Sequence, residues 1–218
     1  MEAKVLRMLV PMTLEGLKVT LGVFAITLIM SLPLAIMVAK LRMSKNKIIS
    51  KITGTYIYIM RGTPLLLQLM FIFFGYYRVP YIGYPFSREQ AIVIAFVLNY
   101  TAYFAEIFRG GINSIDVGQN EASQVLGLSK THTFMKIILP QVIKNVMPSI
   151  GNEVITLVKD TSLVYILGSS DILKAARSVS NVYAAFSPYI YIGIVYLIII
   201  AILTKVLDKI ENKYDYYR

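Results

Sequence analysis

Residues 120–140, NEASQVLGLSKTHTFMKIILP, are the longest polar interval between two apolar blocks of this sequence. With Glu121 and two lysines, the interval does not suit the hydrocarbon of a bilayer. Helix-forming residues run on from Glu121, with apolar side chains at Val125 and Leu128, and Gly127 stands where a short helix would end. A short amphipathic helix in an aqueous loop suits docking onto a water-soluble partner. The alternative is a solvated loop that only joins two membrane spans.

The composition identifies a membrane protein. Of 218 residues, 56% are hydrophobic and 16% are charged, whereas a soluble domain carries about a quarter charged residues. The net charge of +10 lies in clusters between apolar blocks, which reports membrane orientation more often than nucleic-acid binding. The sequence has no cysteine and one histidine, which excludes disulfides, zinc–thiolate sites and a histidine-rich metal site. We predict a single all-α, polytopic domain over 1–218.

Five transmembrane helices are predicted, at 19–39, 52–77, 90–108, 146–167 and 188–207. The first is uncharged for 21 residues, enough to cross a core of about 30 Å as a helix. Residues 1–18 are predicted to form a mixed, amphipathic entry segment.

Basic side chains set the predicted orientation. With the N-terminus outside, the inner side holds the larger share of the cations, including five that follow the first span: Lys40, Arg42, Lys45, Lys47 and Lys51. The positive-inside bias therefore predicts an outer N-terminus and a cytoplasmic C-terminus. It also places the loop 116–140 in the cytoplasm, where ATP is.

Polar residues inside the spans indicate a substrate pathway, because ionisable groups in a span usually face an interior or a water-filled path. Pro64 cannot donate to the carbonyl of Met60, which loosens the second span around Thr63, and opened backbone is tolerated only where protein or a polar cavity covers it. Helical spacing places Asn99, Tyr103 and Glu106 on one stripe of the third span. It places Glu153, Thr156 and Asp160 on one stripe of the fourth span, the acidic stripe. We predict one polar cavity lined by spans two, three and four, with these substrate-binding candidates: Thr63, Asn99, Glu153, Thr156 and Asp160.

Internal pairing is the alternative for several of these charges. Arg61 and Lys159 would then neutralise Glu153 and Asp160, and Glu106 would pair with Arg109 at i+3. A gating or structural role is predicted for Arg61, Pro64 and Lys159. For Glu106 and Arg109, pairing is the favoured interpretation.

The spacing within the polar loop resembles the signature loop of the membrane subunits of ABC importers. The run Glu121-Ala122-Ser123 is followed after three residues by Gly127, and after nine more by 137–140, IILP. In that family the loop forms the coupling helix, which sits in a groove of the ATP-hydrolysing subunit. Ser123 stands where the family usually has a second alanine. The resemblance assigns ATPase coupling to Glu121, Ala122, Ser123, Gly127 and Leu128.

Three further segments resemble the polar amino-acid permeases, the histidine, glutamate, glutamine, arginine and opine group of ABC importers. Residues 60–69, MRGTPLLLQL, resemble the second-span signature of that group. Residues 99–114, NYTAYFAEIFRGGINS, resemble the segment before the coupling helix, and 159–163, KDTSL, the end of the fourth span. The resemblance extends over nearly half the chain and implies a type I ABC importer fold in a bacterial cell membrane.

The resemblance also implies partners and a mechanism. A pair of membrane subunits would work with two ATPase subunits and an extracytoplasmic binding protein that delivers the amino acid. A homodimer is favoured, because the chain has both a complete coupling loop and a complete candidate site. The sequence has no Gly-x-x-x-x-Gly-Lys-Ser/Thr loop, so ATP and magnesium are expected on the partner ATPase. No catalytic residue, metal or cofactor is expected in this chain. Alternating access would be driven through the docked loops.

The acidic stripe favours a cationic substrate, because a basic side chain needs an additional anion. We therefore expect arginine, lysine or histidine, with Glu153 and Asp160 as the anions. One competing hypothesis is an ion-gradient-driven secondary transporter or channel that works without an ATPase, for which five spans without inverted repeats are few. Another is a membrane-embedded enzyme, against which the lack of a metal-ligand cluster or nucleophile set speaks.

Overall fold

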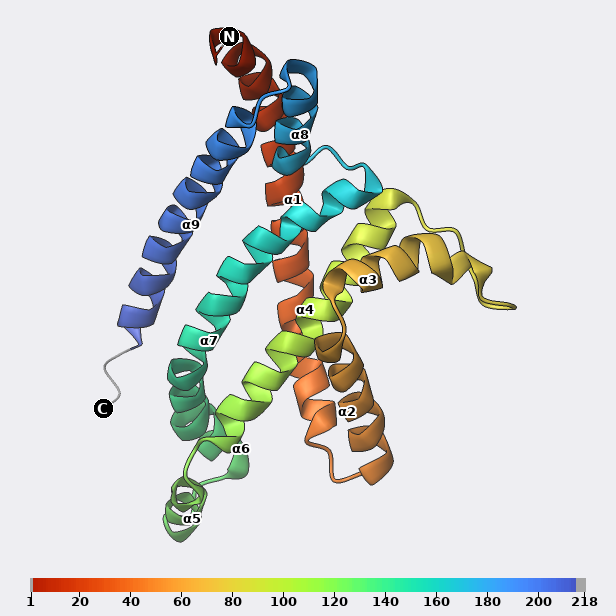
Figure 1. Ribbon diagram of the computed structural model, residues 1–218. Helices are drawn as coiled ribbons and strands as arrows, with labels where there is room; N and C mark the ends of the chain where they lie inside the picture. Colours follow the sequence, from red (N-terminus) through yellow and green to blue (C-terminus); the bar gives the residue numbers. More distant parts are fainter. Residues whose placement is uncertain (1, 215–218) are drawn as a thin grey trace.

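The computed structural model describes residues 2–214, so residue 1 and residues 215–218 of the predicted domain lie outside the described part. All regular structure in 2–214 is helical (Figure 1). The α-helices are α1 (Glu2–Arg42), α2 (Lys47–Gly62), α3 (Leu65–Met70), α4 (Arg88–Asn113), α5 (Val117–Val125), α6 (Lys130–His132), α7 (Leu139–Asp160), α8 (Ile172–Tyr183) and α9 (Ser187–Lys213). Short π-helices cover Phe71–Gly75 and Thr133–Ile138, and 3₁₀-helices cover Tyr76–Arg78 and Thr161–Leu167.

Three of these helices, α1, α4 and α9, are long and apolar enough to cross a membrane. A fourth span is formed if α2 and the segment Leu65–Arg78 count as one, although the two are bent by 105°. The predicted span 146–167 is helical, as α7 and the 3₁₀-helix after it, but its ionisable residues keep its hydropathy low. The count of five spans therefore stays a prediction.

The first helix differs from its predicted boundaries. Residues 1–18 were expected to be an entry segment, but α1 is one helix from Glu2 through both Pro11 and Pro33. Leucine, methionine and alanine are good helix formers, and packing overrides the two prolines. Val5 and Leu9, in the first turns, are buried against α8 and α9.

Helices α1 and α4 form the most extensive helix pair of the fold. Small side chains on both helices, including Ala35, Ala39, Ala91 and Ala95, are buried at their contact. Small residues allow close approach of helix backbones in a bilayer. The same cluster contains Phe96, Tyr100 and Leu157, so the main core lies where α4 crosses between α1 and α7.

The helix ends are set by side-chain caps. Asn46 accepts from two amides at the start of α2, and Ser87 forms a capping box with Gln90 at the start of α4. Asp171 caps α8 in the same way. Figure 1 shows that α5, α6 and the α1–α2 turn lie toward one end of the molecule, whereas α8 lies at the other.

Candidate functional site

The second span breaks at Thr63 and Pro64, as predicted. Both residues have extended backbone angles, which separates α2 from α3. Because Pro64 has no N–H, the carbonyl of Met60 lacks its helical donor. It accepts instead from Nε2 of Gln68 at 2.9 Å and from Nδ2 of Asn99 at 3.0 Å.

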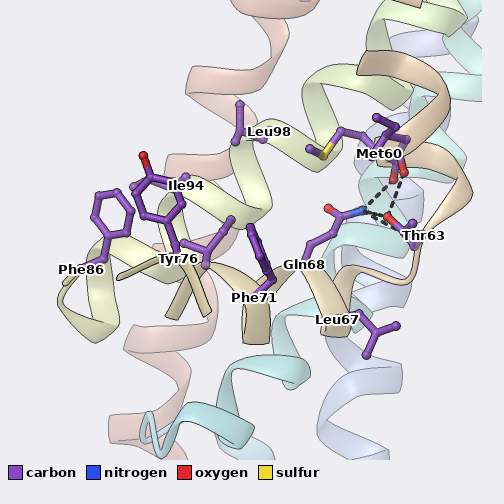
Figure 2. A pocket seen from close by; sticks show the side chains of 11 residues that line it. Met60, Thr63, Leu67, Gln68, Phe71, Tyr76, Phe86, Ile94 and Leu98 are labelled. Atoms are coloured by element: carbon purple, nitrogen blue, oxygen red, sulfur yellow. Dashed lines mark hydrogen bonds between the residues drawn. The ribbon is translucent and has the colours of Figure 1, made fainter. Parts of the chain in front are cut away.

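Gln68 connects the two sides of this break (Figure 2). Its Nε2 also lies 2.8 Å from Oγ1 of Thr63, and its Oε1 accepts from Asn99 at 3.0 Å. The Thr63 hydroxyl in turn donates to the carbonyl of Ile59 at 2.8 Å. Thr63 and Asn99, both predicted to bind substrate, are therefore already engaged in closing the broken helix. We call Met60, Thr63, Gln68 and Asn99 the helix-break clasp.

A cavity of 570 Å³ lies beside the clasp, between α2, α3 and α4. Figure 2 shows mostly apolar side chains around it, including Leu67, Phe71 and Leu98. Its polar side-chain groups come from Thr63, Gln68 and Tyr76. None of its lining residues comes from α7. The cavity at Thr63 is thus mostly apolar and does not contain the three candidate residues of the fourth predicted span.

The α7 candidates have different partners. Asp160 accepts a hydrogen bond of 2.8 Å from the hydroxyl of Tyr100 on α4, and Tyr100 is buried. The hydroxyl of Thr156 donates to the carbonyl of Asn152, one turn back on its own helix, at 2.9 Å. Within residues 2–214, Glu153 makes no hydrogen bond or ion pair, although it is in Coulombic range of Arg61 and Asp160. Within residues 2–214, both carboxylate oxygens of Glu153 are therefore free to accept, whereas Asp160 has one oxygen engaged by Tyr100.

The predicted pairing of Glu106 with Arg109 is confirmed. Nε and Nη2 of Arg109 lie 2.9 Å and 2.6 Å from the two carboxylate oxygens of Glu106. Arg61 is 4.0 Å from Glu106 and lies over the ring of Tyr103, with Cζ 5.3 Å from the ring centroid. Arg61 and Lys159 form no ion pair with Glu153 or Asp160 within the described residues. The gating or structural roles of Arg61, Pro64 and Lys159 stay predictions.

The predicted short helix in the polar loop is α5. Asp116 caps its start by accepting from the amide of Gly118 at 2.6 Å. At its end Gly127 has φ +69°, a left-handed conformation that glycine adopts at little cost. The amides of Leu128 and Gly127 donate to the carbonyls of Ser123 and Gln124, both at 3.0 Å. This is a Schellman motif, so Gly127 ends the helix as predicted.

The loop residues predicted to couple to an ATPase lie on different faces. Glu121, Ala122 and Gly127 are exposed, and Leu128 is half-buried. Ser123 is 2% exposed, with its hydroxyl donating to Gln119 at 2.7 Å. Among the apolar side chains of this segment, Val117, Val125 and Leu126 are exposed. The segment therefore exposes three apolar side chains, and Ser123 packs inward.

Two residues of the site were missed by the sequence analysis. Gln68 lies four positions after Pro64 inside the quoted segment 60–69, and a polar side chain just after a helix-breaking proline was a usable signal. Tyr100 lies next to Asn99 but carries no sequence signal of its own, because its partner Asp160 is on another helix.

Comparison with known proteins agrees with these features. Residues 31–215 match the family of binding-protein-dependent transport system inner membrane components. The arginine transport system permease protein ArtQ of Bacillus subtilis is 36% identical over 94% of this chain and 93% of its own. The putative glutamine transport system permease protein GlnP of Rickettsia bellii is 38% identical over 91% of each chain.

Solved structures give the same assignment. A crystal structure of an amino acid ABC transporter with histidines superposes with a TM-score of 0.86, at 34% identity over 94% of both chains. The inward-facing MetNI methionine ABC transporter shares the fold alone, with a TM-score of 0.70 and 16% identity over 98% of this chain and 99% of its own. The chain therefore belongs to the binding-protein-dependent transport system inner membrane component family, as a permease subunit of the polar amino-acid ABC importers.

Proposed function

We propose that this permease carries basic amino acids, such as arginine, lysine and histidine, and that Glu153 and Asp160 bind the cationic part of the substrate. The observation that supports this is the Glu153 carboxylate, which has no hydrogen-bond or ion-pair partner within residues 2–214 and is only partly exposed. A partly buried carboxylate without a fixed partner favours a cationic ligand. Thr156 lies on the same stripe, and Thr63 and Asn99 would act through the helix-break clasp.

The relatives' names do not decide the substrate. They include permeases for arginine at 36% identity, for glutamine at 38% and for nopaline, from Agrobacterium fabrum, at 32% over 92% of this chain and 87% of its own. The proposal of a basic substrate therefore depends on the α7 carboxylates.

In this proposal α5 is the coupling helix. The exposed side chains of Val117 and Val125, and of Leu126 directly after the helix, would dock in a groove of an ATPase subunit. Glu121 and Ala122 would lie beside them. Two ATPase subunits would bind ATP and magnesium, and this chain would contribute no catalytic group. Two copies of the permease and an extracytoplasmic amino-acid-binding protein would complete the importer, which would work by alternating access.

The basic side chains support the proposed orientation in a bacterial cell membrane. Lys40 and Arg42 end α1, and Lys47 and Lys51 lie in the first turns of α2, at the end of the molecule toward which α5 also lies (Figure 1). With that end in the cytoplasm, the positive-inside bias is satisfied and the N-terminus is outside.

Substrate binding to Glu153→Gln tests the proposed specificity. Loss of one charge-assisted contact is worth about 1.5–3 kcal/mol, so arginine binding to the purified permease–ATPase complex should weaken about tenfold to a hundredfold. Glutamine binding should change much less. Glu211→Gln, the same exchange at an exposed position near the end of α9, is the control. Equal loss of both ligands would show that Glu153 is structural.

Uptake into proteoliposomes tests the energy source. The complex with its ATPase should accumulate substrate only with ATP, whereas the permease alone should not. Gradient-driven accumulation by the permease alone would instead establish the secondary transporter or channel.

A further inference from the structure

A second cavity, of 500 Å³, lies between the end of α1, the helix α2 and the C-terminal half of α4. Three guanidinium groups and one carboxylate line it, from Arg42, Arg61, Arg109 and Glu106. The lining of the cavity therefore carries more positive than negative charge. Charged groups at membrane depth are costly without a partner.

The three arginines are not equally engaged. Arg109 spans both oxygens of Glu106, and Nη1 of Arg42 donates to the hydroxyl of Ser50 at 2.7 Å. Arg61 stays 4.0 Å from Glu106, beyond hydrogen-bond distance. In the described part of the chain, no hydrogen bond involves the guanidinium of Arg61, whose side chain is 42% exposed. The N–H donors of the Arg61 guanidinium are thus available to an acceptor on a ligand.

The position of this guanidinium is nevertheless restrained by Tyr103. It lies over the face of Tyr103, with Cζ 5.3 Å from the ring centroid, and an aromatic face attracts a cation. The Tyr103 hydroxyl also contacts the main-chain carbonyl of Arg61 at 3.5 Å. Arg61 lies in the last turn of α2, directly before the break that the clasp closes. A cation held in this way is oriented before any ligand arrives.

Arg61 lies in Coulombic range of Glu106, which lines the cavity, and of Glu153 on α7. An amino acid has a carboxylate at one end and at least one ammonium group. Guanidinium groups bind carboxylates through two parallel N–H donors. With its carboxylate on Arg61, a basic amino acid would direct its cationic groups toward Glu153.

We infer that Arg61 binds the α-carboxylate of the transported amino acid, and that the arginine-lined cavity receives this carboxylate as the substrate moves toward the α5 end. The inference rests on the proposed function and adds the carboxylate partner, which the α7 residues do not supply.

Binding of arginine and of argininamide to the purified permease–ATPase complex tests this inference, because the amide has the same size without the carboxylate charge. The native complex should prefer arginine by about tenfold to a hundredfold, the value of one charge-assisted contact. Arg61→Gln should abolish that preference by weakening arginine alone. Arg61→Lys, which keeps the charge without the two-pronged geometry, should keep part of it, so this variant gives the answer if Arg61→Gln fails to assemble.

The control is Arg78→Gln, at an exposed arginine whose Nε bonds to the Tyr77 hydroxyl, and it should keep the full preference. A full preference in both Arg61 variants would overturn the inference. The inference would also be overturned if the Arg61→Gln complex lost bound phosphatidylglycerol but kept the full preference for arginine over argininamide. The cavity would then be a lipid site. If the complex binds glutamine rather than arginine, the basic specificity fails, and glutamine against glutaminamide still tests Arg61.

Discussion

The side-chain amide of Asn99 on α4 lies 3.0 Å from the main-chain carbonyl of Met60 on α2, where it supplies a donor that Pro64 cannot. Asn99 is 4% exposed, so this contact is shielded from water. The break in the second span is therefore held by two side-chain amides, from Asn99 and Gln68, that replace a missing main-chain bond.

Asn99→Ala should destabilise the permease. The change leaves Met60 with one donor and Oε1 of Gln68 with none, and a buried unsatisfied polar group costs about 1–3 kcal/mol. Asn181→Ala, at an exposed position of α8, should have little effect on thermal unfolding of the complex. In a double-mutant cycle, Asn99→Ala and Gln68→Ala should be coupled by about 0.5–3 kcal/mol; strictly additive losses would contradict the clasp.

Gly127→Ala should destabilise the end of α5 through backbone conformation alone. A Cβ at Gly127 would meet no atom within 4 Å, but φ is +69°, and the left-handed conformation costs an L-residue about 1–2 kcal/mol. Hydrogen exchange at the amides of Gly127 and Leu128 should become faster. Gly193→Ala on α9 is the control, because its Cβ also meets nothing within 4 Å and its φ is not positive. It should leave exchange at the amides of Gly127 and Leu128 unchanged. The same unchanged exchange in Gly127→Ala would argue against the Schellman cap.

Gly16→Ala should separate α1 from α8. A Cβ at Gly16 would lie 2.6 Å from the main-chain carbon of Asp171 and 2.7 Å from the amide nitrogen of Ile172, and backbone cannot move aside as a flexible side chain can. Such overpacking costs about 1–3 kcal/mol. Gly22→Ala, farther along the same helix, meets nothing within 4 Å. Equal thermal stability of the two variants would show that the helices are less tightly packed than this contact requires.

The stability of the permease should depend on pH through Asp171, which lies between two predicted spans. Burial raises the pKa of its carboxyl. Hydrogen bonds from the main-chain amides of Lys174 and Leu173 lower the pKa, but by less than burial raises it. Because the folded state then holds the proton more tightly, this group favours folding below its ordinary pKa of about 3.9, and the contribution is lost as pH rises through the raised value. Glu15 and Lys174 line the small cavity at this carboxyl.

Asp171→Asn keeps the shape of the cap and removes this titration. The melting temperature of the variant minus that of the unchanged protein should increase from about pH 4 to about pH 7, starting near the ordinary pKa. A constant or decreasing difference would mean that burial does not dominate at Asp171.

The features that follow from single residues were predictable. Pro64 breaks the second span because proline restricts its own backbone and has no N–H. Gly127 ends α5 because glycine adopts a positive φ at little cost. The pair Glu106 and Arg109 follows from helical spacing. These predictions needed no knowledge of how the helices cross.

The features that depend on helix crossing were not predictable from spacing. Asn99 reaches Met60 and Tyr100 reaches Asp160 only because α4 packs between α2 and α7. Asn99 and Asp160 were predicted to bind substrate, although part of their hydrogen-bonding capacity serves neighbouring helices. The start of α1 at Glu2 was not predictable from the mixed composition of residues 1–18, because it depends on burial of Val5 and Leu9 against α8 and α9.

The π-helix Thr133–Ile138 follows α6 and runs directly into α7, and α5 packs against it. The segment from Lys130 onward is therefore one helical rod that begins beside α5 and carries Glu153 and Asp160 farther along. Under the coupling role proposed for α5, a displacement of α5 would reach Glu153 and Asp160 through continuous helix, with Pro148 inside α7 on the way. The π-helix lies between α5 and these carboxylates, so a change in its winding would alter how much of that displacement is transmitted.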